Sequence, residues 1–361
     1  MSLLLYVTSL EARAGKTALG AALGRRLLEN GKRVGYFKPV RVARGVNEGE
    51  DPDAGFMRQV LGLPEPVSAL APAMPADELA LRKAESARRG AVASRVKAGL
   101  DAVARDKDVV IVEEGLDDQG SGLALAQASG AAAQAVGAKA LLVVRPTHRT
   151  KPEVVVSAAR SLGQSFIGVV LNAVPQMHQR WVRDELMPAL AQQGITVLGV
   201  IPEERALLAV TVEDMVKRLE AEVVLCPDRL GPLVENIMVG CLTLDNGDLY
   251  YRRHASKVVI SRADRPDFQF AALETPTHAL FLTGNADTSF YVLEKAESLK
   301  VPVVRTRRDT PATIAALEPL LAAPTFYYPQ KLERMARLVA QHVDAAGIFK
   351  ALGLNIALQG A

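Results

Sequence analysis

The sequence predicts an α/β protein with a mostly parallel sheet, followed by a smaller αβ region and C-terminal helices. Three observations lead to this prediction. Short apolar runs rich in β-forming residues alternate with helical stretches up to about Pro202. A polar, helical connector interrupts the series near residues 203–215, and a second set of shorter runs follows it. Amphipathic helix then covers the last stretch, from Pro329 to about Leu354.

The first series is expected to form a sheet that helices cover on both faces. Its strands are expected at residues 3–8, 33–40, 108–115, 138–146, 166–174 and 196–202. Its helices are expected at residues 16–29, 122–137 and 152–163. Strands buried on both faces appear in a sequence as nearly continuous apolar runs, and these strands have that pattern.

The second series predicts a separate, smaller αβ domain. Its strands are expected within residues 236–244, 257–261, 278–284 and 301–306, and its helices at 266–274 and 289–300. We therefore predict a first domain over residues 1–210, a second over 211–325 and a C-terminal helical segment over 326–361.

Composition narrows the classes of function and partner. The chain has 361 residues with 43 basic and 40 acidic side chains, so a net charge of +3 gives no electrostatic argument for nucleic acid as a partner. No apolar run approaches the length of a bilayer span, and the first residues lack a basic leader with a cleavage site. We expect a cytoplasmic protein with no membrane partner. Cys226, Cys241 and Trp181 are expected to pack in the core.

The segment between the first strand and the first helix is typical of a phosphate-binding loop. A loop that runs into a helix N-terminus offers free backbone N–H groups and a positive dipole end to a phosphate. Lys16 can reach the β- and γ-phosphates, and the Thr17 hydroxyl can bind Mg²⁺. The usual spacing would place the first glycine at position 10, where this chain has Leu10. The competing interpretation is a helix start with an incidental Gly-Lys-Thr.

The nucleotide-binding residues predicted in this loop are Glu11, Ala12, Arg13, Ala14, Gly15, Lys16, Thr17 and Ala18.

Two carboxylates are candidates for binding Mg²⁺ together with Thr17. Glu114 ends the strand at 108–115, at the carboxyl edge where ligands bind in open α/β sheets. Asp53 lies in a polar loop after the second strand. The alternatives are an ordinary carboxylate at a strand end and a solvated acidic loop. Glu113 is expected to point to the opposite face from Glu114, because side chains alternate along a regular strand.

Lys38 and Asn172 stand at the ends of two other strands. Lys38 could neutralise charge that develops during phosphoryl transfer, so Lys16 and Lys38 are the candidate catalytic residues. The alternative for Lys38 is a surface lysine. Asn172 could read the edge of a nucleobase, or it could merely terminate its strand.

The second domain carries a candidate ligand site of its own. Asp264 and Arg265 follow one apolar strand, and Thr283 and Gly284 follow the next. If the two strands are neighbours, both pairs lie at one carboxyl edge and could hold a phosphate or carboxylate group. The alternative is purely structural, with Asp264 capping a helix and Thr283-Gly284 forming a turn. Arg305 and Asp309 could join that edge.

Several of these residues resemble the dethiobiotin synthetase family. The resemblance rests on Lys38-Pro39-Val40, Asp53-Ala54, Glu114-Gly115 and Asn172, with Ser9 at the position of the family's first loop glycine. It implies that Asp53 and Glu114 bind Mg²⁺ and that Asn172 lies beside the base. This chain lacks the glycine-rich substrate loop of true synthetases after Glu114-Gly115, which argues against dethiobiotin as a product.

A wider resemblance, from residue 3 to about residue 350, is to the N-terminal part of long bacterial phosphate acetyltransferases. Glu114-Gly115-Leu116 is similar to a motif of that family. Residues 263–267 and 282–285 resemble a DRTGG domain, with Asn285 at the position of its last glycine. The resemblance implies a dethiobiotin-synthetase-like P-loop domain followed by a DRTGG domain, and a homodimer. The acetyltransferase domain would begin where this chain stops, which argues against acetyl transfer by this chain alone.

Three hypotheses of function follow. The first is a regulatory or sensor protein that binds ATP and Mg²⁺ and responds to a small anionic effector. The second is an ATP-dependent enzyme that phosphorylates a carboxylate or carbamate, with Lys16, Lys38 and the metal ligands positioning the transferred group. The third is an interaction module in which the nucleotide is structural.

Overall fold

The computed structural model describes residues 2–39, 41–43, 50–75, 86–115, 132–240 and 249–356. The chain divides into two compact units. The first unit comprises Met1–Glu203 and Pro329–Ala361, and the second comprises Glu204–Tyr328. Most of the helix expected at 122–137 lies outside the described residues, as do Val40, Leu116 and Cys241. Among the described residues, no helix is long and apolar enough to cross a membrane.

A six-stranded parallel sheet forms the centre of the first unit. Its strand order is β2-β5-β1-β6-β7-β8, so the first strand lies inside the sheet with neighbours on both sides. The strands are β1 (Leu3–Ser9), β2 (Val34–Phe37), β5 (Val109–Glu113), β6 (Lys139–Val144), β7 (Phe166–Val174) and β8 (Val197–Pro202). A separate parallel pair consists of β3 (Arg41–Ala43) and β4 (Ala73–Pro75). The sheet confirms the α/β class predicted from the apolar runs.

Helices follow most of these strands. In the first unit they are α1 (Lys16–Glu29), α2 (Pro52–Leu61), α3 (Val67–Leu70), α5 (Ser86–Val103), α7 (Pro152–Ser161), α8 (Gln179–Trp181), α9 (Met187–Gln192), α16 (Pro329–His342) and α17 (Ala345–Ala351). A π-helical turn at Val182–Leu186 joins α8 to α9.

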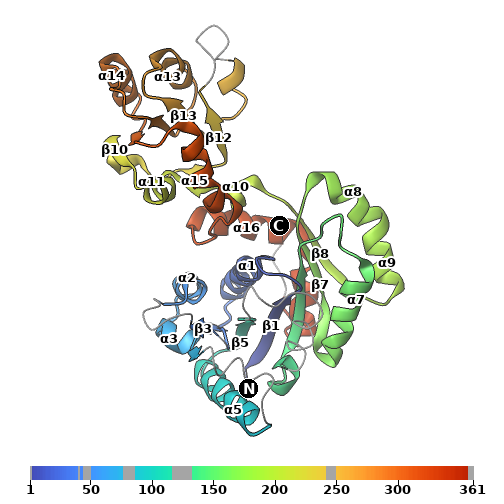
Figure 1. The fold of residues 1–361 in the computed structure, drawn as a ribbon. Coiled ribbons are helices and arrows are strands. Elements are labelled where there is room, and N and C mark those ends of the chain that lie inside the picture. Colours follow the sequence, from blue (N-terminus) through green and yellow to red (C-terminus); the bar gives the residue numbers. More distant parts are fainter. Residues whose placement is uncertain are drawn as a thin grey trace. The chain divides into compact units, whose positions relative to one another are not determined.

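The pleat of the sheet explains why α1 and α5 lie on opposite faces (Figure 1). Gly24 of α1 approaches the Ile111 side chain closely, and Gly99 of α5 approaches the ring of Phe37. Ile111 pairs with Tyr36, and Phe37 is the next residue along β2, so Ile111 and Phe37 point to opposite faces. The small glycines let both helices pack tightly on the apolar strands.

The C-terminal helices belong to the first unit. Helix α16 packs on α1 and on β8, and α17 packs on β7 and β8. An antiparallel bridge between Gly199 and Val343 links β8 to the turn between the two helices. A Cβ at Gly199 would lie 2.7 Å from the His342 carbonyl oxygen, so this close approach requires glycine.

The second unit contains a five-stranded sheet with the order β10-β15-β14-β13-β12. The strands β12 (Asn236–Val239), β13 (Lys257–Arg262), β14 (Ala279–Thr283) and β15 (Val303–Thr306) are parallel, and β10 (Glu222–Leu225) is an antiparallel edge strand. A short antiparallel pair consists of β9 (Val210–Thr211) and β11 (Leu233–Val234). The helices are α10 (Arg205–Leu208), α11 (Val212–Leu219), α13 (Pro266–Leu273), α14 (Phe290–Ser298) and α15 (Thr310–Ala322).

Both faces of this second sheet are buried. Val259 packs with residues of α13 and α14 on one face. Its neighbours Val258 and Ile260 pack with residues of α11 and α15 on the other. Each unit therefore has a core of its own, as expected for two domains.

Candidate functional site

Residues 10–15, which we call the phosphate loop, connect β1 to α1 in the first unit. Gly15 has a φ of 92°, a left-handed conformation that only glycine adopts without strain. A Cβ at Gly15 would lie 2.2 Å from Asn172 Nδ2. The same Asn172 Nδ2 donates a hydrogen bond of 2.7 Å to the Ala14 carbonyl. Asn172 of β7 therefore holds the end of the loop. This contact between Asn172 and Ala14 is not evident from the sequence.

Ser9, the last residue of β1, comes directly before the phosphate loop, and its hydroxyl is hydrogen-bonded on both sides. Lys16 Nζ donates to Ser9 Oγ at 2.8 Å, and Ser9 Oγ donates to the Glu11 carbonyl at 2.7 Å. Leu10 is buried. The Ser9 side chain thus supports the compact loop without a glycine at position 10.

Glu11 ties the phosphate loop to the end of the next strand. Its Oε1 accepts a hydrogen bond from the backbone N–H of Arg145, the residue after β6. Burial raises the pKa of Glu11, although this hydrogen bond and the charges of Lys16 and Arg145 oppose the shift. Ala12 and Arg13 form the exposed tip of the loop, and Arg13 has a positive φ of 58°.

A cluster of oxygen atoms surrounds the Thr17 hydroxyl at the first turn of α1. Thr17 Oγ1 lies 2.6 Å from Glu113 Oε1 and 3.1 Å from Asp53 Oδ1. The hydroxyl of the fully buried Tyr36 donates to Glu113 Oε2 at 2.9 Å. Lys38 Nζ forms an ion pair of 2.7 Å with Asp53 Oδ2. Strands β2 and β5 and the start of α2 thus meet beside the phosphate loop.

Lys38 is held by two carboxylates. Besides Asp53 it contacts Asp51 Oδ2 at 3.1 Å, and Asp51 also caps α2 by accepting from the Ala54 N–H. Burial by itself lowers the pKa of Lys38, but the charges of Asp53, Glu113 and Asp51 raise it overall. Lys38 is therefore a cation held inside the acidic cluster. It is not the surface lysine that the sequence left open.

Burial and the neighbouring Asp53 carboxylate raise the pKa of Glu113 to about 7, against the opposing charge of Lys38. The cluster therefore contains more carboxylate groups than the single ammonium of Lys38 can neutralise. Burial and the Glu113 charge also raise the pKa of Tyr36 well above its ordinary value, so Tyr36 stays a neutral hydrogen-bond donor.

Glu114 contacts the end of β1. Its Oε2 accepts hydrogen bonds from the Thr8 hydroxyl at 2.9 Å and from the Ser9 N–H at 3.3 Å. The two glutamates point in different directions, as expected, but Glu113 and not Glu114 is brought to Thr17. The reason is the pleat, because Glu113 shares the face of Ile111, which α1 covers.

The donor set around Thr17 fits Mg²⁺. It offers the Thr17 hydroxyl and the carboxylates of Asp53 and Glu113. The Lys38 ammonium already places a positive charge against the Asp53 carboxylate. Mg²⁺ binds one or two carboxylates and keeps several water or phosphate oxygens. In the described part of the chain, no group of three or more acidic, histidine or cysteine side chains forms a metal site. The set therefore suits a metal that a bound phosphate completes.

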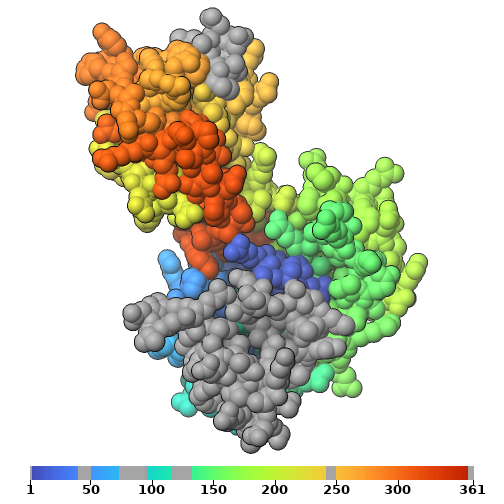
Figure 2. All heavy atoms as spheres, viewed as in Figure 1, coloured from blue at the N-terminus to red at the C-terminus, as the bar shows by residue number. Residues whose placement is uncertain are grey.

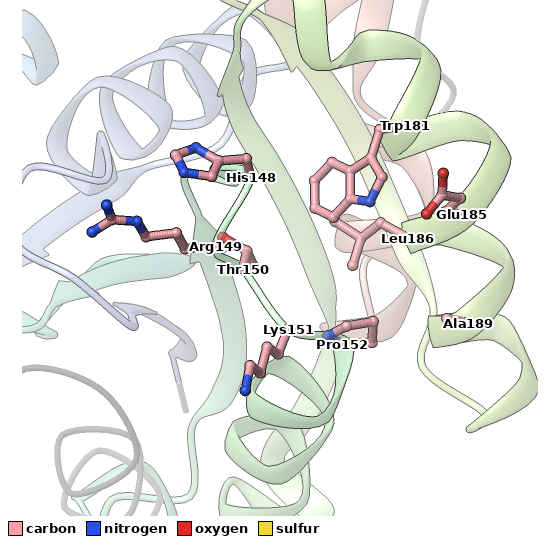
Figure 3. A pocket seen from close by; sticks show the side chains of 9 residues that line it. All are labelled: His148, Arg149, Thr150, Lys151, Pro152, Trp181, Glu185, Leu186 and Ala189. Carbon is pink, nitrogen blue, oxygen red and sulfur yellow. The ribbon is translucent and has the colours of Figure 1, made fainter.

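A cavity of about 630 Å³ opens at the same edge of the sheet, between the loop after β6 and the segment formed by the end of α8, the π-helical turn and the start of α9 (Figure 3). His148 and Trp181 lie on opposite sides of it, and Leu186 forms part of its apolar wall. The green segment that carries these elements lies at the surface in the space-filling view (Figure 2). The residues that line it are His148, Arg149, Thr150, Lys151, Pro152, Trp181, Glu185, Leu186 and Ala189.

This cavity was not predicted. The sequence analysis assigned Trp181 to packing, and the ring is instead half-buried with one side facing the cavity. Among the described residues, neither Arg149 nor Lys151 forms an ion pair, and both side chains extend from the loop on the side away from Trp181 (Figure 3). A loop and a helix separated by about 30 residues form the cavity together, and no motif in the sequence marks it.

In the second unit, the two predicted motifs lie side by side. Arg262 at the end of β13 pairs with Thr283 at the end of β14, so both motifs share one carboxyl edge. Gly284 has a φ of 88°, and the Thr283 and Thr310 hydroxyls lie 2.8 Å apart. The strands are therefore neighbours, as the site hypothesis required.

The charged residues of that edge are paired with each other. Asp264 binds Arg262, and Arg265 binds Asp267 at 2.7 Å, with its guanidinium 3.6 Å from the ring centroid of Phe268. Asp264 does not cap α13, because the cap position is Arg265 and no side chain accepts there. Arg305 pairs with Glu222, and Asp309 caps α15.

The sheet, the phosphate loop and the oxygen cluster at its base define a P-loop NTPase-like α/β domain. The AAA domain family model AAA_26 matches residues 4–211, and the DRTGG domain model matches residues 214–320. The chain belongs to the AAA_26 family and carries a DRTGG domain after it, which confirms the predicted domain types.

The similarity to phosphate acetyltransferases is also confirmed. The phosphate acetyltransferase of Haemophilus influenzae is 22% identical over 384 residues, which cover 96% of this chain and 52% of that protein. The chain spans about half the length of the curated relatives it matches.

Solved structures resemble parts of the chain. Cobyrinic acid a,c-diamide synthase from Mycobacterium smegmatis, with bound ADP and magnesium, is 20% identical with a TM-score of 0.34 and covers 57% of this chain and 88% of its own. The CBS and DRTGG region of Clostridium perfringens pyrophosphatase, complexed with diadenosine tetraphosphate, is 15% identical with a TM-score of 0.27. The match covers 42% of this chain and 72% of that one.

Proposed function

We propose that the chain binds ATP with Mg²⁺ at the phosphate loop and acts as a regulatory or sensor protein. The observation that carries the proposal is the meeting of Lys16, Thr17, Lys38 and Asp53 at one end of α1. The loop supplies backbone N–H groups, and Lys16 supplies charge to the phosphates. Mg²⁺ is bound by Thr17 and Asp53 with a glutamate from the end of β5, and it neutralises the phosphate charge.

Calorimetric titration with Mg-ATP tests nucleotide binding. We expect binding by the wild-type chain and its loss in Lys16→Ala. Lys139→Ala, an exposed lysine at the opposite end of the same sheet, should bind like the wild type. No heat of binding in the wild type would contradict the proposal.

The second candidate is an ATP-dependent enzyme that phosphorylates a carboxylate or carbamate. It is favoured by Lys38, which lies beside the metal ligands, where it could neutralise charge on a transferred phosphoryl group. Steady ATP turnover by the purified chain, stimulated by a small carboxylate and lost in Lys38→Met, would support the enzyme. Tight binding without turnover would support the sensor.

Either function needs a second ligand, and the cavity beside Trp181 is where we place it. The positive charge of Arg149 and Lys151 on the loop beside the cavity favours a small organic anion, and the His148 and Trp181 rings on its two sides suit a flat apolar portion. Trp181 is the sole tryptophan of the chain, so its fluorescence reports on this cavity directly.

The test is a fluorescence titration with 4-nitrobenzoate, a flat anion, against the neutral 4-nitrobenzamide. We expect saturable quenching by the anion, weakened in Arg149→Ala. Arg160→Ala, on the exposed part of α7 outside the cavity, is the control. Equal quenching by both compounds would argue against an anion site.

A further inference from the structure

The two adjacent glutamates at the end of β5 have separate surroundings, and only one of them faces the metal ligands. Glu113 Oε1 lies 2.6 Å from Thr17 Oγ1, and the same hydroxyl lies 3.1 Å from Asp53 Oδ1. Glu114 accepts hydrogen bonds from Thr8 and Ser9 at the end of β1, just before the phosphate loop. Both glutamates are almost completely buried, with 3% and 2% exposure, so neither side chain has room to reorient without breaking these contacts.

The Glu113 carboxylate is fixed from its far side. Its second oxygen accepts the hydrogen bond of 2.9 Å from Tyr36, whose side chain is completely buried in β2. Tyr36 pairs with Ile111 in the neighbouring strand, so its ring lies on the same face of the sheet as Glu113 and α1. The remaining oxygen, Oε1, is thereby directed at Thr17.

We propose that Glu113, held by Tyr36, is the glutamate that binds Mg²⁺ with Thr17 and Asp53, and that Glu114 instead fixes the end of β1 that leads into the phosphate loop. This inference rests on the proposed function. Tyr36 is a positioning residue, since it touches Glu113 and not the metal. It acts as an outer-shell partner that orients a ligating carboxylate.

Assigning Glu113 to the metal and Glu114 to the end of β1 also explains how two buried hydrogen-bond donors are satisfied. A carboxylate that accepts from the Thr8 hydroxyl and the Ser9 N–H satisfies two donors at a buried strand end, where unpaired donors are costly. If Glu114 turned to the metal, these two groups would lose their acceptor. Glu113 can bind the metal and keep its hydrogen bond to Tyr36.

The test measures the metal and the nucleotide separately in the full chain. Mn²⁺ serves as the probe, and free Mn²⁺ is followed by electron paramagnetic resonance at saturating ADP. ADP affinity is measured by calorimetry in EDTA. We expect Glu113→Gln to weaken Mn²⁺ binding by about 100-fold and Tyr36→Phe by about 10-fold, with ADP affinity in EDTA unchanged. Glu114→Gln keeps an acceptor oxygen and should keep its Mn²⁺ affinity, whereas Glu114→Ala removes the acceptor and should weaken ADP binding in EDTA.

The double variant Tyr36→Phe/Glu113→Gln separates positioning from general damage. It should bind Mn²⁺ no more weakly than Glu113→Gln alone, because Tyr36 acts only through Glu113. Additive losses, unchanged Mn²⁺ binding in Tyr36→Phe, or loss of Mn²⁺ in Glu114→Gln but not in Glu113→Gln would each overturn the inference.

Thermal unfolding midpoints identify any variant that fails to fold, and Tyr36→Phe and Glu113→Gln each test the inference alone. If the wild type binds no ADP, the proposed function fails. If it binds ADP and Mn²⁺ but Glu113→Gln is neutral, only this inference fails.

Discussion

At the scale of single residues, Gly15 and Asn172 show that the end of the phosphate loop packs tightly against β7. Gly15 combines a left-handed backbone with a side-chain neighbour that leaves no space for a methyl group. Asn172, which the sequence offered as a reader of the nucleobase or as a strand end, bonds the backbone of Ala14. Its amide nitrogen is thus engaged with the loop itself.

Gly15→Ala should therefore suffer both strain and a clash. We expect a loss of roughly 2–4 kcal/mol in the free energy of unfolding, measured by urea denaturation. Gly31→Ala is the matched control, since Gly31 also has a positive φ but nothing within 4 Å of its Cβ position. It should lose only about 1 kcal/mol. Equal losses in the two variants would mean that the contact with Asn172 does not matter.

Lys257 is a buried residue of the second unit that makes stability depend on pH. Its side chain is fully shielded, its ammonium donates to the Pro276 carbonyl, and burial lowers its pKa to about 8. Between pH 8 and 10.5 the unfolded chain keeps this proton and the folded chain has lost it, so stability rises with pH in that window.

We expect the free energy of unfolding of the wild type to rise relative to Lys257→Met by up to about 3 kcal/mol between pH 8 and 10.5. Denaturant titrations at several pH values measure the difference. Lys139→Met, an exposed lysine, should show no such trend. A flat difference for Lys257→Met would show that its ammonium is stable in the folded protein.

At the scale of elements, the ends of strands and the starts of helices determine the candidate sites. The pleat of β5 assigns Glu113 to the face of α1, and a shift by one residue would assign Glu114 instead. The start of α15 shows how a helix start determines the role of a candidate residue. Asp309, a candidate ligand residue from the sequence, accepts the Ala312 N–H at 2.8 Å and so acts as a helix cap.

Asp309→Ala should lower the free energy of unfolding of the second unit by about 1 kcal/mol, because it leaves a helix N–H without its acceptor. Asp309→Asn keeps a capping oxygen and should be nearly neutral. Thermal or chemical denaturation checks both. If Ala and Asn destabilise equally, the charge of Asp309 and not its cap would be the stabilising feature.

At the scale of the whole molecule, two units with separate cores make up the chain. The first is assembled from both ends of the sequence, since Pro329–Ala361 returns to it after the second unit. The second has its own buried faces on both sides of its sheet. A ligand of the first unit should therefore stabilise that unit selectively.

Differential scanning calorimetry with Mg-ADP tests this. We expect one unfolding transition to move to higher temperature and the other to stay. At a ligand concentration 100 times its dissociation constant, the stabilisation should be about 2.7 kcal/mol. Lys16→Ala should abolish the shift. A single transition that moves as a whole would show that the two units unfold together.

The sequence by itself determined the α/β class, the position of the phosphate loop and the two domain types. These depend on local patterns, namely apolar runs, a Gly-Lys-Thr before a helix, and motifs that follow strands. Only the tertiary structure decided which glutamate faces Thr17, that Asn172 holds the loop, and that Trp181 borders a cavity. Those facts depend on the pleat of β5 and on contacts between residues more than 30 positions apart in the chain. No local pattern encodes such contacts, because the distant partner is chosen by how the strands and helices pack.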